Sequence, residues 1–472
     1  MRRKNRAELI IENLEIIEAG SEGVSLGKYE DRVVFVPCVV PGDVIDAQVI
    51  KRKKSFYQAR AVNIHRYSAN RADPPCTHFG VCGGCKWQNM LYETQLFYKR
   101  KQVIDNFQRI GKFDFSEVLP ILPSEDIFAY RNKVEYTFSN KRWLQKEEMP
   151  DADAGRINTC GLGFHLQGMF DKVLDIQHCY LHDDLGNEIR NAVKEYAVEH
   201  AVSFWNTRSQ EGLLRNLIIR NSTCGDVMLI LVFTALVAET KALLTFIADK
   251  FPQITSLLYV INTKMNDSVA DLQTHVFKGK DFMTEKMNDL TFKVSPLAFY
   301  QTNAKQALKL YEATARLADV KRSQTVYDLY TGTGTIALFV AKNARKVVGI
   351  EYVASAIENA RENAALNNIS NADFFVGDMA KIFTDSFIEE NGKPDVIIAD
   401  PPRMGMHPKV VEQILNISPE RIVYVSCNPA TQARDIALLT EKYKVTAVQP
   451  VDMFPHTHHV ENIALLERIG NE

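Results

Sequence analysis

The chain has 472 residues, of which 46% are apolar and 24% are charged, and its formal net charge is −2. This balance excludes a disordered or fibrous protein, and the length predicts about three domains. The most apolar stretch, residues 227–238, is too short to cross a bilayer, and the charged amino terminus contains no signal core, so a cytoplasmic protein is expected.

The charge is unevenly distributed along the chain. Residues 1–145 contain 23 Lys and Arg against 17 Asp and Glu, whereas the remainder contains 33 against 41. A basic amino-terminal third is typical of a module that docks a polyanion. Short apolar runs between turn signals predict a small antiparallel β-barrel over residues 1–66. Its basic run at 51–54, beside Phe56 and Tyr57, favours contact with RNA, although a soluble lysine-rich hairpin would have the same composition.

Four of the eight cysteines form a three-plus-one pattern. Cys76, Cys82 and Cys85 lie in one Pro- and Gly-rich loop, and Cys179 lies far downstream. In a long cytosolic chain this clustering indicates metal binding or catalysis rather than disulfides. The arrangement suits an iron–sulfur cluster, with a zinc site of four cysteines as the competing interpretation.

The remaining chain divides into two patterns. Residues 67–290 predict a mixed α+β region, with a helix at 89–110 and strands at 133–139, 161–166, 216–220, 227–233 and 257–262. From residue 291 to 472 short apolar strands alternate with helices, and the strands are expected at 325–330, 346–351, 395–400 and 421–426. This alternation predicts an α/β fold, with a doubly wound, mostly parallel sheet.

The first strand of this sheet leads into a glycine loop. Gly332 and Gly334 let the backbone approach a ligand, and the helix that follows favours an anionic group. Glu351 ends the second strand, where a carboxylate can accept both ribose hydroxyls, and Asp378 ends the third. The loop alone would also suit NAD, because the dinucleotide fingerprint tolerates Ala337 at its third glycine position.

Two further strand ends carry reactive side chains. Asp400 begins an Asp-Pro-Pro-Arg motif, and its combination with the glycine loop resembles class I methyltransferases that use S-adenosylmethionine. Cys427 ends the next strand, at the edge where open α/β sheets place active sites. A cysteine there can be a covalent nucleophile, and Glu461 or the histidines of 454–462 can remove a proton. The alternative for Cys427 is a buried structural cysteine.

Four motifs together resemble the bacterial RNA uracil-C5 methyltransferase family, over nearly the whole chain. They are Ser-Pro-Leu-Ala-Phe-Tyr-Gln301, Asp400-Pro-Pro-Arg403, Ser-Cys427-Asn-Pro and Phe-Pro-His-Thr-His-His-Val-Glu461. The resemblance implies methylation of a uridine at C5 through a covalent bond from Cys427 to C6, with Glu461 removing the C5 proton. It also implies that S-adenosylmethionine contacts Gln301, Tyr330, Glu351, Asp378 and Asp400.

The resemblance further implies the surroundings of the reaction. Phe299 and Arg403 are expected beside the target base, which must be extruded from folded RNA. Thr335 departs from the Asn that some members have there. Several members that act on ribosomal RNA carry an amino-terminal TRAM barrel and a 4Fe–4S cluster. This implies a cluster on Cys76, Cys82, Cys85 and Cys179, rather than Cys160, and 23S rRNA as the substrate, with tRNA as the alternative.

Three other functions compete with this one. An iron–sulfur radical enzyme for methylthiolation would need a Cys-x3-Cys-x2-Cys core, whereas five residues separate Cys76 from Cys82 here. An exocyclic-amine methyltransferase would have an aromatic residue after Asp-Pro-Pro, and it would have no use for Cys427 or Glu461. A non-catalytic RNA-binding or assembly protein on the same fold stays open. A monomer is the expected state.

Overall fold

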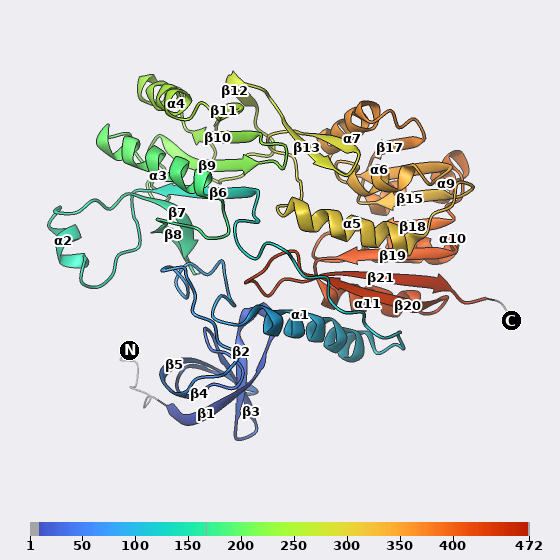
Figure 1. Cartoon of the computed structure of the whole chain (residues 1–472), viewed down its shortest axis with the longest axis horizontal. Coiled ribbons are helices and arrows are strands. Elements are labelled where there is room, and N and C mark those ends of the chain that lie inside the picture. The colour runs from blue at the N-terminus through green and yellow to red at the C-terminus, as the bar shows by residue number, and fades with distance from the viewer. Residues whose placement is uncertain (1–8, 167, 471–472) are drawn as a thin grey trace.

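The amino-terminal part of the chain is a closed β-barrel. The computed structural model describes residues 9–166 and 168–470 (Figure 1). The strands close in the order β1-β2-β3-β5-β4, with bounds β1 Ile10–Ala19, β2 Ser25–Tyr29, β3 Arg32–Val36, β4 Val44–Arg52 and β5 Phe56–Arg66. The predicted barrel is confirmed, although β3 and β5 pair in parallel rather than antiparallel. Its predicted first eight residues lie outside the described ranges.

Alternation along the barrel strands decides which side chains fill its core. Val34, Ile45 and Ala47 are fully buried, as the inward positions of a small barrel require. Tyr57 is also only 5% exposed, and the Arg32 guanidinium lies 5.0 Å from the centre of its ring. Of the two aromatic residues beside the basic run, Tyr57 therefore belongs to the barrel core, because the pleat of β5 turns Tyr57 and Ala59 inward.

The central part is a seven-stranded sheet in the order β12-β11-β10-β9-β6-β7-β8. Its strands are β6 Lys133–Ser139, β7 Gly161–Leu166, β8 Met169–Asp175, β9 Leu214–Asn221, β10 Val227–Phe233, β11 Ser256–Ile261 and β12 Thr274–Gly279, and its helices are α2 Met149–Asp153, α3 Asp184–Glu199 and α4 Ala238–Lys250. Leu229 and Leu231 pack with α3 and α4. Ile230 on the other face packs towards the hairpin of β13 Met283–Met287 and β14 Leu290–Val294. Burial on both faces explains the continuous apolar run of β10.

The carboxyl-terminal part is a second seven-stranded sheet, in the order β17-β16-β15-β18-β19-β21-β20. Its strands are β15 Thr325–Leu329, β16 Lys346–Glu351, β17 Ala372–Val376, β18 Val396–Ala399, β19 Arg421–Ser426, β20 Tyr443–Val451 and β21 Glu461–Arg468. Its helices are α5 Ala304–Ala318, α6 Thr335–Ala341, α7 Ala354–Leu366, α8 Met379–Ile382, α9 Asp385–Asn391, α10 Pro408–Ile417 and α11 Pro429–Leu439. All strands are parallel to their neighbours except β21, which is antiparallel to β19 and β20. The predicted doubly wound sheet is confirmed.

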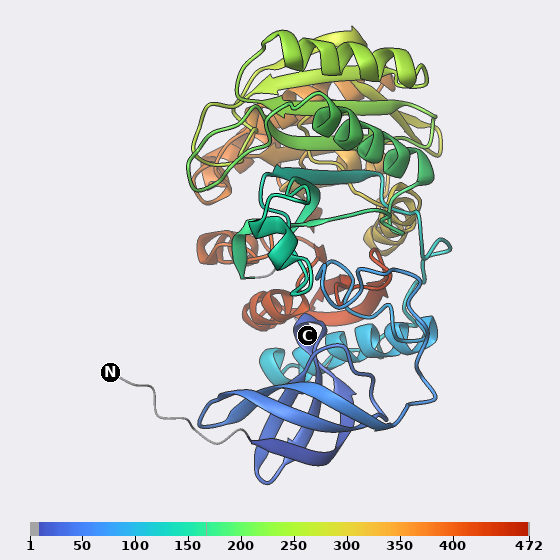
Figure 2. The same cartoon turned by 90° about the vertical axis from the view of Figure 1, so that its left-hand side faces the viewer.

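A segment from the amino-terminal half of the chain completes this second sheet. Helix α1, Tyr92–Asn106, lies between the barrel and the β20–β21 edge (Figures 1 and 2). The chain after it runs beside β20, where Phe115, Val118 and Leu122 form bridges to Val445, Val448 and Val451. We therefore propose three domains, 1–66, 67–290 and 291–472. The α1 segment belongs to the second of these by sequence but packs on the third.

The barrel and the central sheet lie at opposite ends of the molecule, with the second sheet beside both (Figure 2). Within the described residues, no helix has both the length and the apolar character needed to cross a membrane.

Candidate active site

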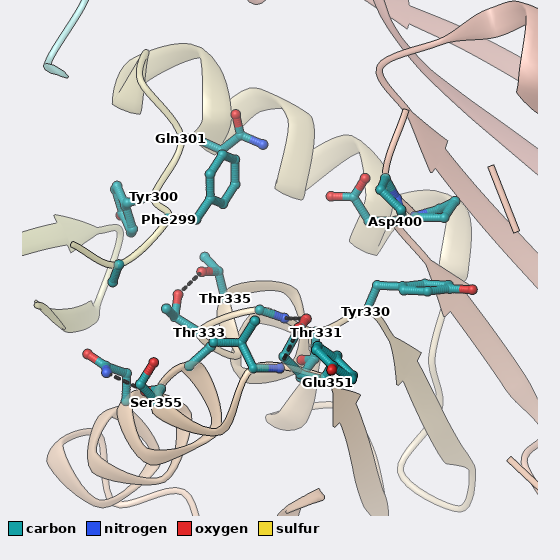
Figure 3. Close-up of a pocket in the computed structure, with 18 of the residues that line it drawn as sticks. Phe299, Tyr300, Gln301, Tyr330, Thr331, Thr333, Thr335, Glu351, Ser355 and Asp400 are labelled. Atoms are coloured by element: carbon teal, nitrogen blue, oxygen red, sulfur yellow. Dashed lines mark hydrogen bonds between the residues drawn. The ribbon is translucent and has the colours of Figure 1, made fainter. Parts of the chain in front are cut away.

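One cavity of about 1300 Å³ lies at the carboxyl ends of the parallel strands. Its lining includes all of the predicted catalytic and cofactor-contacting residues and both predicted neighbours of the base: Phe299, Gln301, Tyr330, Glu351, Asp378, Asp400, Arg403, Cys427 and Glu461. Figure 3 shows Gln301 and Asp400 on opposite sides of this space, with Glu351 below them. Carboxyl ends of parallel strands meet at one edge of a sheet, so residues distant in sequence converge there.

The glycine loop forms the floor of the cavity. Tyr330 and Gly332 both have positive φ, 66° and 56°. This conformation is strained for Tyr330, which carries a side chain, and it persists only where the surrounding structure imposes it. Glu351 holds the loop, because its carboxylate accepts the Gly332 N–H at 3.2 Å and the Val353 N–H at 3.0 Å. A Cβ added to Gly332 would meet no heavy atom of the described residues within 4 Å. The loop therefore faces open space that a ligand can fill.

Asp328 supports the loop from beneath. Its carboxylate accepts the Thr331 hydroxyl at 2.5 Å and the Ala337 N–H at 3.0 Å. Burial, offset in part by these hydrogen bonds, raises the pKa of Asp328 to about 7. Its other oxygen, Oδ1, finds no hydrogen-bond partner among the residues that the structure describes. Asp328 belonged to the predicted strand, but the sequence did not indicate this supporting contact.

The roof of the cavity is a loop held from the central sheet. Phe299, which is 72% exposed, follows a turn whose carbonyls at Ser295, Pro296 and Ala298 all accept from Nη1 of Arg220, at 3.2, 2.8 and 3.0 Å. Asn132 donates to the carbonyl of Gln301 at 3.1 Å. Arg220 and Asn132 were missed in the sequence, because a polar residue within a strand or just before one carries no sign of its distant partner.

Cys427 and Glu461 come from neighbouring strand ends. Strands β19 and β21 pair with Ser426 opposite Asn462, so the residue after β19 lies beside the first residue of β21. Gln432 locks this end of the sheet, since it donates to the Tyr424 and Asn462 carbonyls at 2.8 and 3.1 Å. Cys427 is half-buried, and Glu461 is 6% exposed. The two side chains therefore share one corner of the cavity.

The Asp400-Pro-Pro-Arg403 turn is tied to the same corner. Asn428 and Thr431 donate to the Arg403 carbonyl at 3.0 and 3.2 Å. Burial raises the pKa of both Cys427 and Glu461, and the Arg403 cation offsets part of each rise. It is the positive charge placed to favour a thiolate at Cys427.

Burial dominates the electrostatics of this corner. It raises the pKa of Glu461 to about 8, and the nearby Asp400 charge adds to this shift. Burial, followed by the charge of Asp328, raises the pKa of Asp400 to about 7. The Cys427 thiol has its pKa raised to about 11, by burial first and then by Glu461 and Asp400. Carboxyl groups with a pKa near neutrality are suited to proton transfer.

The histidines of 454–462 were alternative candidates for the base. His456 stacks on Phe128 with ring centres 4.4 Å apart, and it is not among the residues lining the cavity. Burial lowers the pKa of His456, His458 and His459 to about 4. Of the predicted candidates, Glu461 is the one that lines the cavity.

A second cavity, of about 600 Å³, gathers four cysteines. Cys76, Cys82, Cys85 and Cys179 all line it, whereas Cys160 packs against the core of the central sheet. Burial raises the pKa of Cys82 to about 11 and of Cys85 to about 12, and the neighbouring thiols add to both shifts. Within the described ranges, no three His, Cys, Asp or Glu side chains are grouped so as to hold a single metal ion. The predicted cluster therefore stays a prediction.

Comparison with known proteins places the chain in a family. Residues 267–469 match the sequence model of the tRNA (uracil-5-)-methyltransferases. An uncharacterized RNA methyltransferase of Bacteroides thetaiotaomicron is 57% identical over 452 residues, which cover 95% of this chain and 99% of the relative. The chain belongs to the tRNA (uracil-5-)-methyltransferase family. A second member, an uncharacterized RNA methyltransferase of Chlorobaculum tepidum, is 40% identical over 91% of this chain and 90% of its own length.

A solved structure of the same family extends the match to the fold. The tRNA (uracil-54, C5)-methyltransferase of Pyrococcus abyssi, in complex with S-adenosyl-L-homocysteine, is 28% identical. It superposes with a TM-score of 0.74 and covers 96% of this chain and 100% of its own. This methyltransferase is therefore an S-adenosylmethionine-dependent enzyme that acts on RNA, built as a class I methyltransferase sheet with a preceding barrel.

Proposed function

We propose that this methyltransferase forms 5-methyluridine in RNA through a covalent bond between Cys427 and C6 of the uracil. The observation that carries the proposal is the shared corner of Cys427 and Glu461, in the same cavity as Gln301, Glu351 and Asp378. A nucleophile beside a base is the arrangement that covalent catalysis requires. An amine methyltransferase would have no use for this pair.

The proposed reaction begins at Cys427. Uracil C5 is too weak a nucleophile to take a methyl group unaided. The Cys427 thiolate, favoured by Arg403, adds to C6, and the electrons of the C5–C6 double bond move towards C5 and O4. C5 then forms its bond to the methyl group that a bound S-adenosylmethionine would supply, and the sulfur–methyl bond would break with S-adenosylhomocysteine as the leaving group. Glu461 removes the C5 proton, the C5–C6 double bond re-forms, and the thiolate leaves.

The cavity residues fit a bound S-adenosylmethionine. The open floor at Gly332 and the carboxylate of Glu351 would hold its ribose, and Asp378 would lie near its adenine. Gln301, Tyr330 and Asp400 would complete the contacts. When bound, S-adenosylmethionine supplies an electrophilic methyl group. The protein residues position it and the uracil and exclude water from the space between them.

We propose 23S rRNA as the substrate, with tRNA as the alternative. The barrel is expected to contact RNA through its exposed run at 51–54. The combination of this barrel with a four-cysteine cavity is what the family resemblance associates with ribosomal RNA. The similarity to the Pyrococcus abyssi tRNA enzyme over 96% of this chain is the observation that favours tRNA.

The test is release of tritium from RNA labelled at C5 of uridine. We expect the protein with S-adenosylmethionine to release tritium from 23S rRNA and not from tRNA, because only loss of the C5 proton liberates it. Release from tRNA alone would reassign the substrate and keep the chemistry. Methyl incorporation without release from either RNA would overturn methylation at C5.

We also propose that Cys76, Cys82, Cys85 and Cys179 hold a 4Fe–4S cluster. One cavity lined by four thiols, whose burial disfavours free thiolates, fits a group that binds them as thiolates. The cluster would link the loop of 76–85 to the segment before α3.

Anaerobic reconstitution with iron and sulfide tests this proposal. We expect about four iron and four sulfide per chain with broad visible absorbance, as four cysteines bind a cubane. Cys179→Ser should lose most of the iron, whereas the matched control Cys160→Ser should keep it, because Cys160 lies outside the cavity. One zinc per chain with no iron uptake would identify the site as a zinc site.

A further inference from the structure

The segment before Glu461, residues 452–460, contributes to the lining of both cavities. We call it the base loop. Phe454 lines the catalytic cavity and Thr457 lines the cysteine cavity. The base loop joins β20 to β21, so its path fixes where Glu461 begins its strand. His456 in the loop has a φ of 65°, which is strained for a non-glycine residue and persists only where surrounding contacts impose it.

Those contacts come from one face of α1. Tyr92, Gln95 and Lys99 are spaced by three and four residues, so they lie on one face of the helix. All three make hydrogen bonds to residues of the base loop. We call these three residues the α1 brace. They are separated from the base loop by more than 350 positions in the chain, and they lie outside the segment that matches the family model.

Lys99 and Tyr92 fix the start of the base loop. The Lys99 ammonium donates to Asp452 at 2.6 Å and to the Phe454 carbonyl at 3.0 Å. Tyr92 donates to the other oxygen of Asp452 at 2.9 Å and accepts the Ser124 N–H at 2.8 Å. The side chains of Lys99 and Asp452 are both 0% exposed. A buried pair with these additional hydrogen bonds gives geometric definition more than net stability.

Gln95 fixes the middle of the base loop. Its carbonyl oxygen accepts the His456 N–H at 2.8 Å, and its amide lies 3.2 Å from Nδ1 of the same residue. The amide also donates to the carbonyls of Trp87 and Met90, at 3.0 and 2.8 Å. The Lys86 and Trp87 N–H groups in turn donate to the His456 carbonyl at 2.8 and 3.0 Å. Gln95 thus connects two segments. One is the chain just after the loop of 76–85, and the other is the base loop.

We propose that the α1 brace positions Glu461 for removal of the C5 proton, so that Tyr92, Gln95 and Lys99 are positioning residues of the reaction. This inference rests on the proposed role of Glu461. The brace does not contact the substrate. It sets the path of the base loop, and a shift of about 1 Å in a catalytic group is enough to slow its step by about 10²-fold.

The test separates methyl transfer from proton removal. Gln95→Leu removes the hydrogen bonds and keeps the approximate shape of the side chain. In a reaction with C5-tritiated RNA we expect tritium release to fall about tenfold, because a displaced base loses part of its contribution. The fraction of protein bound covalently to methylated RNA should rise, since adduct formation precedes the affected step. Hydrogen exchange should become faster in peptides that cover 452–461.

Asn262→Leu is the matched control. Asn262 is also a fully buried amide side chain; it donates to the Asn266 carbonyl at 3.0 Å and accepts the Lys264 N–H at 2.9 Å, both in the central part of the chain and away from the base loop. We expect its adduct fraction, tritium release and affinity for S-adenosylhomocysteine to match the wild type. Tyr92→Phe, which removes one hydroxyl from the brace, is the second variant if Gln95→Leu fails to fold, and it should shift the adduct fraction in the same direction.

Two results would overturn the inference. A parallel fall in adduct and tritium release in the brace variants, as in a merely less stable protein, would show that they do not act on the base step. Brace variants that match Asn262→Leu would show the same. A wild-type protein that forms no adduct with any RNA would instead overturn the proposed function, and the inference with it.

Discussion

Cys427→Ala is expected to abolish formation of 5-methyluridine, with a loss of at least about 10⁴-fold, the scale observed when a covalent nucleophile is removed. Without addition at C6, C5 does not become nucleophilic enough to take the methyl group. Cys427 is half-buried at the end of β19, so alanine leaves little empty volume and the fold should persist. The measurement is tritium release from C5-labelled RNA, together with recovery of a protein–RNA adduct on a denaturing gel.

The matched control for this variant is Cys224→Ala. Cys224 is exposed in the turn between β9 and β10, so its loss should leave release and adduct unchanged. S-adenosylhomocysteine should bind Cys427→Ala as it binds the wild type, because the cofactor side of the cavity is untouched. Full activity of Cys427→Ala would assign the cysteine a structural role and remove the covalent mechanism.

Glu461→Gln is expected to trap the reaction after methyl transfer. The amide occupies the same volume but cannot accept the C5 proton, so turnover should fall by about 10²–10⁴-fold, the usual contribution of a general base. The methylated RNA should stay attached to Cys427, and the adduct should accumulate to nearly one per protein. Denaturing gels with methyl-labelled S-adenosylmethionine measure this adduct directly.

Glu285→Gln is the control for the loss of a buried carboxyl group. Glu285 is 0% exposed on β13 and accepts the Thr223 N–H at 3.2 Å, and burial also raises its pKa. Because it lies outside the catalytic cavity, its replacement should not trap an adduct. A Glu461→Gln protein that forms no adduct at all would place Glu461 before methyl transfer rather than after it.

The pH dependence of proton removal follows from the burial of Glu461. Burial raises the pKa of this carboxyl from its ordinary value near 4.5 to about 8, and only the ionised form can accept a proton. When proton removal limits turnover, tritium release should therefore rise by about tenfold per pH unit below pH 8 and level off above it. Residual release by Glu461→Gln should lack this rise.

Local sequence patterns were sufficient for much of the fold. The strands at 161–166, 227–233, 346–351 and 421–426 were predicted with the bounds that the structure has. Such segments are predictable because an apolar run between turn signals has few other ways to bury itself. The candidate functional side chains at the ends of β16, β18 and β19 were also recognisable, because each lies in or directly after the predicted strand. The convergence of Glu351, Asp400 and Cys427 then follows from the geometry of any parallel sheet.

The barrel shows where the local pattern stops being informative. Phe56 and Tyr57 are adjacent in the sequence and were interpreted alike. The structure buries Tyr57 in the barrel core, because β5 alternates its faces and the closure of the barrel selects one face as interior. The phase of that alternation depends on how β5 pairs with its neighbouring strand β4 and with β3, which the whole of β4 separates from β5 in the chain.

The sequence by itself determined the order of the motifs and hence the sheet, the glycine loop and the candidate nucleophile and base. Only the tertiary structure decided which distant residues hold them in place. Arg220 reaches the turn before Phe299 across 75 or more positions, and Gln95 reaches His456 across 361. A side chain's own neighbours in the sequence do not encode such a contact, because it exists only after separate elements have packed and their buried polar groups have found partners.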